Sequence, residues 1–411
     1  MISVDLKPPK IQGNKIFLSW EPCILFKEAG YHIEYLNLTE INTSPQALLE
    51  AYLPVCLAFC ALGEVEINFP YHFDDRVLGV WEKVFKDTSK KLFRNPFGVK
   101  FNNPPIDGVS SIVTRGIETA LLFGGGSESL LTLSYLLDKG ISPYLVSGWG
   151  SNWSGSDLNL NRDRYDQEER ISSEFNLRMF RICSNFRDLT TKCNFYPYLS
   201  KKVYFLNAVL FLPLNLSLLF PIAQQLGLKQ VVSGNEKESS DDVGFYSLSR
   251  EMTCNLKSCS MYVEYFSYLE TIKKIEVVKN LHLQYSKVGK YQCSCFFAKN
   301  QRWCLKCEKC LRNFIIFKIY GINPTDIGMD EQKIKQNMDS DLLMIYRVGW
   351  EIVHNIAVRR EWESIRIEAI KNNNKEVCDI ISRIYKKYTL RKIYNFFNNI
   401  RTLLKDICRN K

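Results

Sequence analysis

Short apolar runs alternate with longer helical patterns through the middle of the chain. The runs are ETALLF, SPYLVSG, LRMFRICSN and KQVVSGN, which begin at residues 118, 142, 177 and 229. Each run is typical of a buried strand and is followed by a segment long enough for a crossover helix. Because parallel strands need such crossovers, the pattern predicts an α/β domain with a doubly wound parallel sheet over residues 115–324.

The two flanking regions have different patterns. Residues 1–105 combine alternating strand patterns at 15–20 and 31–38 with a helical pattern that begins after the cap candidate Ser44. They predict a separate mixed α+β N-terminal domain. Residues 325–411 have helical spacing and become increasingly basic, which predicts a helical C-terminal extension.

The last forty or so residues, 371–411, place many apolar side chains on one side of a helix that is otherwise rich in Lys and Arg. Such a helix could make a peripheral contact with an anionic membrane or bind nucleic acid. A solvated helix that packs its apolar stripe on its own protein is the alternative, and it is the one that we favour.

The run from Tyr204 to Ala223 contains no charged residue and is long enough to suggest a membrane span. It also contains Pro213, Asn215 and Pro221, and polar or helix-breaking groups at this density are poorly suited to hydrocarbon. We therefore predict a helix buried in the α/β core and no transmembrane segment.

Length and composition fit a globular protein of two or three domains, with 411 residues of which 46% are hydrophobic. The first fifteen residues carry prolines and lysines instead of the apolar core of a secretory leader, so the 14 cysteines are expected to be reduced and the protein cytoplasmic. A net charge of +10 is compatible with nucleic acid, nucleotide phosphates or anionic membranes as partners.

The stretch LLFGGGSESLL (121–131) interrupts an apolar strand with three glycines before a helical pattern resumes. Glycine permits positive φ and lets a ligand approach the backbone without a Cβ in the way. Ser127 can cap the helix and Glu128 falls in its first turn, so the exposed N–H groups are predicted to form an anion site. A strand-to-helix turn without a ligand is the alternative.

Two familiar phosphate-binding loops do not fit this stretch. A Walker loop requires a lysine after the glycines, and none follows Gly126. A dinucleotide-binding fingerprint requires glycine where Ser129 stands and an acidic residue about twenty positions further on, where the chain has Gly148 and Trp149.

A cysteine block, CSCFFAKNQRWCLKCEKC, follows the last predicted strand and contains Cys295, Cys304, Cys307 and Cys310 in the spacing C-x8-C-x2-C-x2-C. Cysteines two residues apart place two sulfurs on one tetrahedral ion, and four thiolates complete a closed structural zinc site. Cys293 could take the place of Cys295 in this set of ligands, but we prefer Cys295. Disulfides and an iron–sulfur cluster are the other interpretations of the four thiols.

The glycine stretch resembles the pyrophosphate loop of the N-type ATP pyrophosphatases, the PP-loop superfamily with the adenine nucleotide alpha hydrolase-like (HUP) fold. Their pattern is Ser-Gly-Gly-x-Asp-Ser. In this chain glycine replaces the first serine, and glutamate replaces the aspartate. The resemblance implies that ATP binds through the loop and that Glu128 helps to hold Mg²⁺. The implied ATP-binding residues are Gly124, Gly125, Gly126, Ser127, Glu128 and Ser129.

The cysteine spacing at the end of such a domain resembles the zinc site of the 7-cyano-7-deazaguanine synthases, the QueC family. A Pro-x-Asn element, Pro213 and Asn215, is similar too, since it opens a long helix that leads to a strand ending in Gly234 and Asn235. The preceding N-terminal region, with SGNEKES and RWCLKCEKC, resembles the MurL-type UDP-MurNAc-L-Ala-L-Glu epimerases.

Both families activate a carboxylate with ATP, so the resemblance implies an adenylating enzyme that releases pyrophosphate and acts on a carboxylate-bearing small molecule or peptide-linked substrate. In the QueC family the activated acyl group is converted to an amide or nitrile. In the MurL-type family the activation serves to epimerise the neighbouring carbon. Glu128 and Ser129 are the implied catalytic groups at the pyrophosphate, with Asn235 and Glu236 as substrate or metal contacts. A helix-capping Asn and a solvated Glu are equally compatible with that position.

Two other functions stay open. The zinc cluster and the basic helices would suit a protein that modifies or binds tRNA or another nucleic acid, because five basic residues lie in or just after the cysteine block, namely Lys299, Arg302, Lys306, Lys309 and Arg312. The altered loop could instead mark a non-catalytic scaffold. The four histidines, His32, His72, His282 and His354, are isolated in the sequence and more typical of structural roles.

Overall fold

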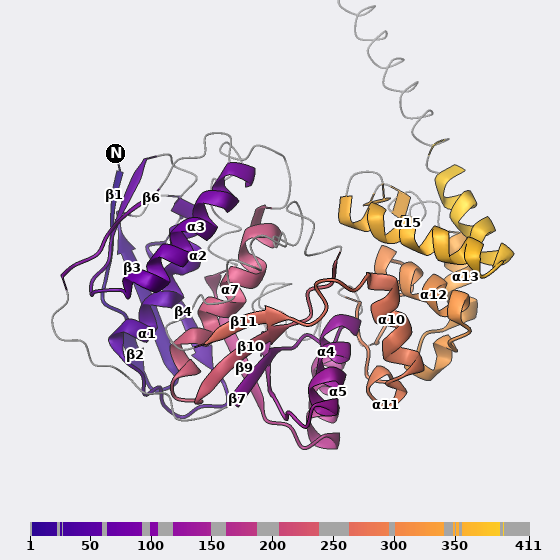
Figure 1. Cartoon of the computed structure of the whole chain (residues 1–411), viewed down its shortest axis with the longest axis horizontal. Coiled ribbons are helices and arrows are strands. Elements are labelled where there is room, and N and C mark those ends of the chain that lie inside the picture. Colours follow the sequence, from indigo (N-terminus) through magenta and orange to yellow (C-terminus); the bar gives the residue numbers. More distant parts are fainter. Residues whose placement is uncertain are drawn as a thin grey trace, which may run out of the picture.

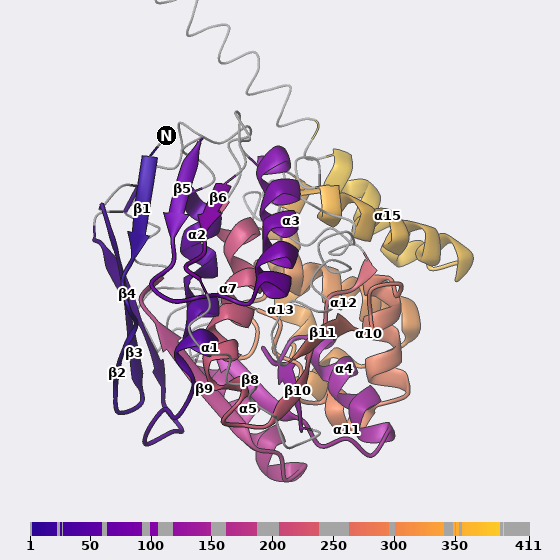
Figure 2. The same cartoon turned by 60° about the vertical axis from the view of Figure 1, so that its left-hand side comes forward.

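The described residues of the computed structural model form an 11-stranded sheet whose order is β11-β10-β7-β8-β9-β4-β3-β1-β5-β6, with β2 paired to β3 (Figures 1 and 2). The structure describes residues 2–22, 25–26, 28–59, 64–92, 99–105, 118–148, 162–186, 205–237, 263–295, 301–340, 348–349, 351–352, 356–386 and 389. The strands are β1 Ile2–Leu6, β2 Lys10–Gln12, β3 Lys15–Glu21, β4 Gly30–Tyr35, β5 Val65–Asn68, β6 Val99–Asn102, β7 Glu118–Leu122, β8 Tyr144–Gly148, β9 Met179–Ser184, β10 Leu228–Ser233 and β11 Glu264–Ser267.

Helices flank this sheet and continue beyond it toward the C-terminus (Figure 1). They are α1 Pro45–Leu49, η1 Glu50–Tyr52, α2 Leu53–Phe59, α3 Asp75–Leu92, α4 Ser127–Asp138, α5 Arg162–Glu174, α7 Phe205–Ala223, α10 Lys274–Leu283, α11 Ser286–Gly289, α12 Glu308–Tyr320, η6 Pro324–Ile327, α13 Glu331–Ser340 and α15 Ile356–Lys371. The α/β class predicted from the sequence is confirmed.

Strands β7 to β11 are mutually parallel where they pair, and their order reverses at β7. The chain runs outward from β7 through β8 to β9, and then returns to place β10 and β11 on the other side of β7. Successive crossovers therefore run in opposite directions from this strand. The carboxyl end of β7 is thus a topological switch point, the position at which open parallel sheets leave a crevice.

Side chains of the parallel strands alternate between two buried faces. Ala120 and Val231 belong to one core, which they share with α7. Their neighbours Leu121 and Val232 belong to a second core, which includes residues of α4, α5 and α10. The alternation explains why each run is almost wholly apolar, because a parallel strand covered by helices on both faces has no solvent side.

The N-terminal strands extend the same sheet and introduce antiparallel pairs. Strand β4 pairs antiparallel with β9, and β3 pairs antiparallel with both β4 and β1. The sheet is therefore mixed, and the expectation of parallel pairing holds for β7 to β11. A separate domain at 1–105 stays a prediction, although its strands share one hydrophobic core with α7 and β10.

Helix α7 accounts for the uncharged run. It begins at Phe205, well before Pro213, so the expectation that the Pro-x-Asn element opens the helix is wrong. Its described apolar side chains from Leu214 onward are buried in the core, and the Tyr35 hydroxyl of β4 donates a hydrogen bond of 2.7 Å to the Leu218 carbonyl. Among the described helices, none is long and apolar enough to cross a membrane.

The cysteine block and the C-terminal helices share a further hydrophobic core that runs from Ile275 to Ile384. Trp362 of α15 is buried there and donates a 2.8 Å hydrogen bond to Glu308 at the start of α12. Ile384, which is part of the predicted apolar stripe, also packs into this core. Most of the stripe, from residue 390 onward, lies outside the described residues, so its membrane or nucleic-acid contacts stay a prediction.

The β4–β9 junction provides a test of how the N-terminal strands are coupled to the rest. Ile33 is fully buried opposite Ser184, and Ile33→Ala is expected to reduce the free energy of unfolding by about 2–5 kcal/mol because it leaves a cavity. Hydrogen exchange in α7 should accelerate with it. Phe17→Ala, at an exposed position of β3, is the control and should change stability by about 0.5 kcal/mol or less. If hydrogen exchange in α7 is unchanged in Ile33→Ala, residues 1–105 unfold independently of the rest.

Candidate nucleotide site and metal centre

The glycine loop joins β7 to α4 at the switch point of the sheet. Gly125 adopts a left-handed φ of +65°, which lets the chain turn sharply, and Gly126 is the N-cap of α4. The helix then begins at Ser127, and the Leu130 N–H donates to the Gly126 carbonyl at 3.1 Å. Figure 1 shows α4 between the sheet and α10, and it contacts β7, β10 and α10. The predicted strand–turn–helix context of the loop is confirmed, but the expectation that Ser127 caps the helix is wrong, because Gly126 is the N-cap and makes no side-chain cap.

The segment after β10 packs directly against the first turn of α4. A Cβ built on Gly234 would lie 2.7 Å from the carbonyl carbon of Glu128 and 2.8 Å from the amide nitrogen of Ser129. Real Cβ atoms do not approach backbone this closely, so glycine is required at 234. The two predicted segments, 124–129 and 234–236, are therefore brought together at one edge of the sheet.

Lys274, the first residue of α10, places its ammonium group at the start of α4. Its Nζ donates to the Ser127 hydroxyl at 2.9 Å and forms an ion pair with Glu128. Burial alone would raise the pKa of the Glu128 carboxyl, but the charge and hydrogen bond of Lys274 outweigh burial and lower this pKa to about 2. The carboxylate predicted to hold Mg²⁺ is thus engaged with a lysine that the sequence analysis did not identify.

A second lysine lies near this pair. Burial, together with the positive charge of Arg312, lowers the pKa of Lys309 to about 8, while the negative charge of Glu128 acts in the opposite direction. Lys309 stands between two cysteines of the block, Cys307 and Cys310. The cysteine block therefore contributes positive charge to the surroundings of the loop.

Arg164 of α5 covers the other side of the loop. A Cβ built on Gly124 would lie 2.5 Å from Nη2 of Arg164, and Gly125 lies against Glu168. Arg164 Nε donates to Glu168 Oε1 at 3.2 Å, and the other carboxylate oxygen accepts a 2.6 Å hydrogen bond from Ser147 at the end of β8. Burial raises the pKa of Glu168, against the lowering effect of the Arg164 charge.

The remaining predicted site residues lie at the same edge but are engaged within the fold. The Ser129 hydroxyl donates to the Gly126 carbonyl at 3.1 Å. Asn235 Nδ2 donates to the Tyr265 hydroxyl at 2.9 Å, which ties it to β11, and Glu236 is buried. These contacts are compatible with structural roles, and ligand contacts for all three stay predictions.

The four predicted cysteine ligands converge. The sulfurs of Cys295, Cys304, Cys307 and Cys310 all lie within 4.8 Å of one another and could hold a metal ion such as zinc. Hydrogen bonds from the other three thiols lower the pKa of Cys304. Among the described residues, the cysteines are free of disulfides, so this interpretation of the cluster is wrong.

The distances between the sulfurs fit one tetrahedral ion. The Sγ–Sγ distance is 3.9 Å for Cys295–Cys307, 3.8 Å for Cys304–Cys310 and 3.5 Å for Cys307–Cys310. A Zn–S bond of about 2.3 Å places the sulfurs of a tetrahedral site about 3.8 Å apart. A polynuclear iron–sulfur cluster binds its thiolates through different irons and holds them farther apart, so a single ion is the better fit.

Cys293 is not part of this group and instead links it to the loop. Its thiol donates to the Arg302 carbonyl at 3.6 Å, and burial raises its pKa to about 11. Its amide N–H donates to the Gly125 carbonyl at 2.8 Å. Because Cys295 follows two residues later, the metal centre and the glycine loop are connected through a very short piece of backbone.

The basic residues of the cysteine block do not form one exposed patch. Arg302 donates to the backbone carbonyls of Lys290 and Ile327. Arg312 is buried and pairs with Glu308 and Glu361, which joins α12 to α15. Of the other three, Lys306 is exposed and Lys309 half-buried, and Lys299 lies outside the described residues.

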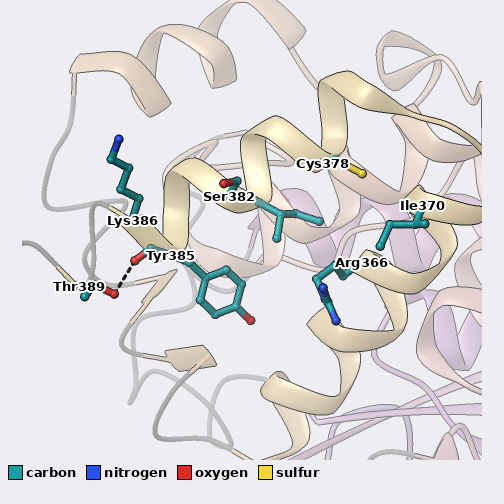
Figure 3. A pocket seen from close by; sticks show the side chains of 8 residues that line it. Arg366, Ile370, Cys378, Ser382, Tyr385, Lys386 and Thr389 are labelled. Carbon is teal, nitrogen blue, oxygen red and sulfur yellow. Dashed lines mark hydrogen bonds between the residues drawn. The ribbon is translucent and has the colours of Figure 1, made fainter.

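A pocket of about 600 Å³ lies elsewhere, among the C-terminal helices (Figure 3). Its lining comes from α15, from the helical residues 375–386 that follow it, and from Thr389. Arg366 on its wall is paired with Glu363. The pocket contains none of the residues predicted for nucleotide or metal binding.

Sequence reasoning missed Arg164, Glu168 and Lys274. The spacing of Arg164 and Glu168, four residues apart on a helix, was a visible signal of an ion pair but not of its place over the loop. Lys274 gave no signal, since it lies far along the chain and reaches Glu128 only because α10 packs on α4. No known protein-family model matches the chain, and no curated protein matches it.

The two neighbouring cysteines allow a matched test of the metal centre. Cys295→Ser is expected to lose the bound metal, while Cys293→Ser should retain about one ion per chain, because only the first supplies a converging sulfur. Metal content after gel filtration, measured by mass spectrometry, checks this. Equal loss of metal in both variants would contradict the assignment.

Lys274→Met tests the ion pair through its pH dependence. A carboxyl group whose pKa is lower in the folded than in the unfolded state stabilises the fold at pH values above its unfolded pKa. This contribution to the free energy of unfolding disappears as the pH falls to the folded pKa. The loss in free energy of unfolding is expected to be on the order of 3 kcal/mol at neutral pH and to shrink between about pH 4.5 and about pH 2. Urea unfolding across this range is the measurement. Glu128→Gln is the control background, in which the effect of Lys274→Met should not vary with pH in the same window.

Proposed function

We propose that the chain is an enzyme that binds ATP at the glycine loop and activates a carboxylate by adenylation. One observation carries the proposal. The loop lies at the carboxyl end of β7, where the strand order reverses, and Arg164 of α5 and Lys274 of α10 lie beside it. A glycine turn, the N-terminus of a helix and two nearby basic side chains together suit a polyphosphate ligand.

The proposed reaction begins when a carboxylate oxygen of the substrate attacks the α-phosphorus of ATP. The bond from that phosphorus to the bridging oxygen breaks, and pyrophosphate leaves with the electron pair, so an acyl adenylate is formed. Catalysis rests on in-line positioning and on neutralising the charge that develops on the leaving group. The loop amides and the Ser129 hydroxyl would hold this pyrophosphate, together with Lys274.

Glu128 has two compatible roles in this scheme. In the described structure it holds Lys274, and so it fixes the direction of that ammonium group toward Ser127. As the proposed ligand of Mg²⁺, it would exchange the lysine for the metal when the Mg²⁺–ATP complex binds. Asn235 and Glu236 follow the Gly234 contact and are the proposed residues for the carboxylate substrate or its metal.

The proposed zinc ion is structural, because four thiols close a tetrahedral site and leave no position for a substrate. The free thiols also suit a reducing compartment, and we propose a cytoplasmic location. Ammonia would then attack the acyl carbon and displace AMP to give an amide, and a second adenylation, on the amide oxygen, would let AMP leave to give a nitrile. In the epimerase branch the α-proton of the acyl adenylate would be removed and returned on the opposite face, and water would then displace AMP. A nucleic-acid substrate is less favoured, because Arg302 and Arg312 are engaged within the protein.

Pyrophosphate release with Mg-ATP tests the proposal. The panel of acceptors should contain amino acids, muropeptides, deazapurine carboxylic acids and tRNA, each tested with and without ammonia. Release that depends on one carboxylate would support adenylation and identify the branch. Release only with tRNA would favour nucleic-acid modification, and no release with any member would favour a non-catalytic scaffold.

Two glycine variants provide the matched control for that assay. Gly234→Ala is expected to reduce pyrophosphate release about tenfold or more, because its Cβ would push against the backbone of Glu128 and Ser129 and misplace the loop. Gly79→Ala, in α3 with open space around its Cβ position, should leave activity unchanged and slightly raise stability. Circular dichroism of both variants separates a local effect from unfolding. Full activity in Gly234→Ala would argue against this loop as the site.

A further inference from the structure

The space above Gly124 is filled by the guanidinium group of Arg164. A Cβ at this position would lie 2.5 Å from Nη2 and 3.6 Å from the guanidinium carbon, so any side chain at 124 would displace the arginine. Gly124 is not among the glycines with positive φ, so its backbone conformation does not by itself require glycine. Its lack of a side chain is therefore explained by the arginine above it.

The guanidinium is held from behind by buried groups. Its Nε donates to Glu168, whose side chain is fully buried, and Ser147 donates to the second oxygen of that carboxylate. Glu168 is on the same helix as Arg164, and Ser147 is the last residue but one of β8, the strand next to β7. Only 13% of the Arg164 side chain is exposed. Its orientation over the loop is thus set before any ligand arrives.

We propose that Arg164 binds the phosphate group that the glycine loop receives, and that Glu168 and Ser147 position it. The proposal rests on the proposed function and adds the residue that selects a polyphosphate. A guanidinium offers planar, paired donors that match phosphate oxygens. Lys274 supplies further positive charge at the start of α4, the helix that follows the loop.

Arg164 thereby replaces a function that the loop itself lacks. Gly124 has no hydroxyl to offer a phosphate, and the Ser129 hydroxyl would first have to leave the Gly126 carbonyl in order to bind one. An arginine that served only to neutralise Glu168 would not require a glycine beneath its terminal nitrogen. An arginine that merely filled the loop would exclude ligands. This alternative predicts that removing the arginine strengthens ATP binding, whereas a ligand role predicts weaker binding.

The test measures binding of Mg-ATP, pyrophosphate and adenosine to the full chain by isothermal titration calorimetry. Arg164→Gln is expected to weaken ATP and pyrophosphate roughly tenfold to a hundredfold, as for other lost hydrogen bonds to a charged group, and to leave adenosine unchanged. Arg170→Ala removes the same charge from an exposed position of α5 and should have no such effect. A variant that was only misfolded would lose adenosine as well.

A double-variant cycle separates a direct role from a structural one. Gly124→Ala should weaken ATP by pushing the guanidinium aside, and it should cause no further loss when it is added to Arg164→Gln. Independent, additive losses would overturn the proposal.

The outcomes distinguish this proposal from the proposed function. If the unaltered chain binds ATP and Arg164→Gln binds it equally well or more tightly, Arg164 is not a ligand, although the loop is still a nucleotide site. If the unaltered chain binds neither ATP nor pyrophosphate, both proposals fail. Selective loss of the phosphate-containing ligands in Arg164→Gln supports both.

Discussion

Five parallel strands that must be covered on both faces determine how the helices around the glycine loop are arranged in the described part of the chain. Parallel pairing leaves no solvent side, so the apolar positions of β7 to β11 need α7 on one face and α4, α5 and α10 on the other. This requirement brings α10 onto α4, although the two helices are separated by more than a hundred residues of sequence. The position of Lys274 beside Glu128 is a direct consequence of that packing.

The glycine loop is a point at which separate parts of the fold meet. Gly234 presses on the first turn of α4, Arg164 lies over Gly124, and the Cys293 amide holds the Gly125 carbonyl. A Cβ at 124 or 234 would meet the neighbouring segment, whereas glycine at 125 is required by its left-handed φ. The glycines thus serve the packing of the protein as well as any ligand.

The electrostatic balance at this edge departs from that of a simple carboxylate–metal site. Glu128 is matched by Lys274 and Arg164 by Glu168, and Lys309 adds positive charge close by. Cations beside the N-terminus of a helix favour an anionic ligand and disfavour an isolated divalent cation. In the proposed function, magnesium would therefore enter together with the polyphosphate.

The sequence by itself determined the class of the fold, the four strands β7 to β10, the glycine turn and the set of four cysteines that converge. These features depend on short-range patterns, namely apolar runs, glycine at a strand end and the spacing of thiols. It did not reveal β11, the antiparallel junction of β4 with β9, or the start of α7 at Phe205. Only the tertiary structure decided that Arg164, Lys274 and Cys293 meet at the loop, because such contacts arise when distant helices are packed on a common sheet, and no local pattern of residues encodes which side chains that packing brings together.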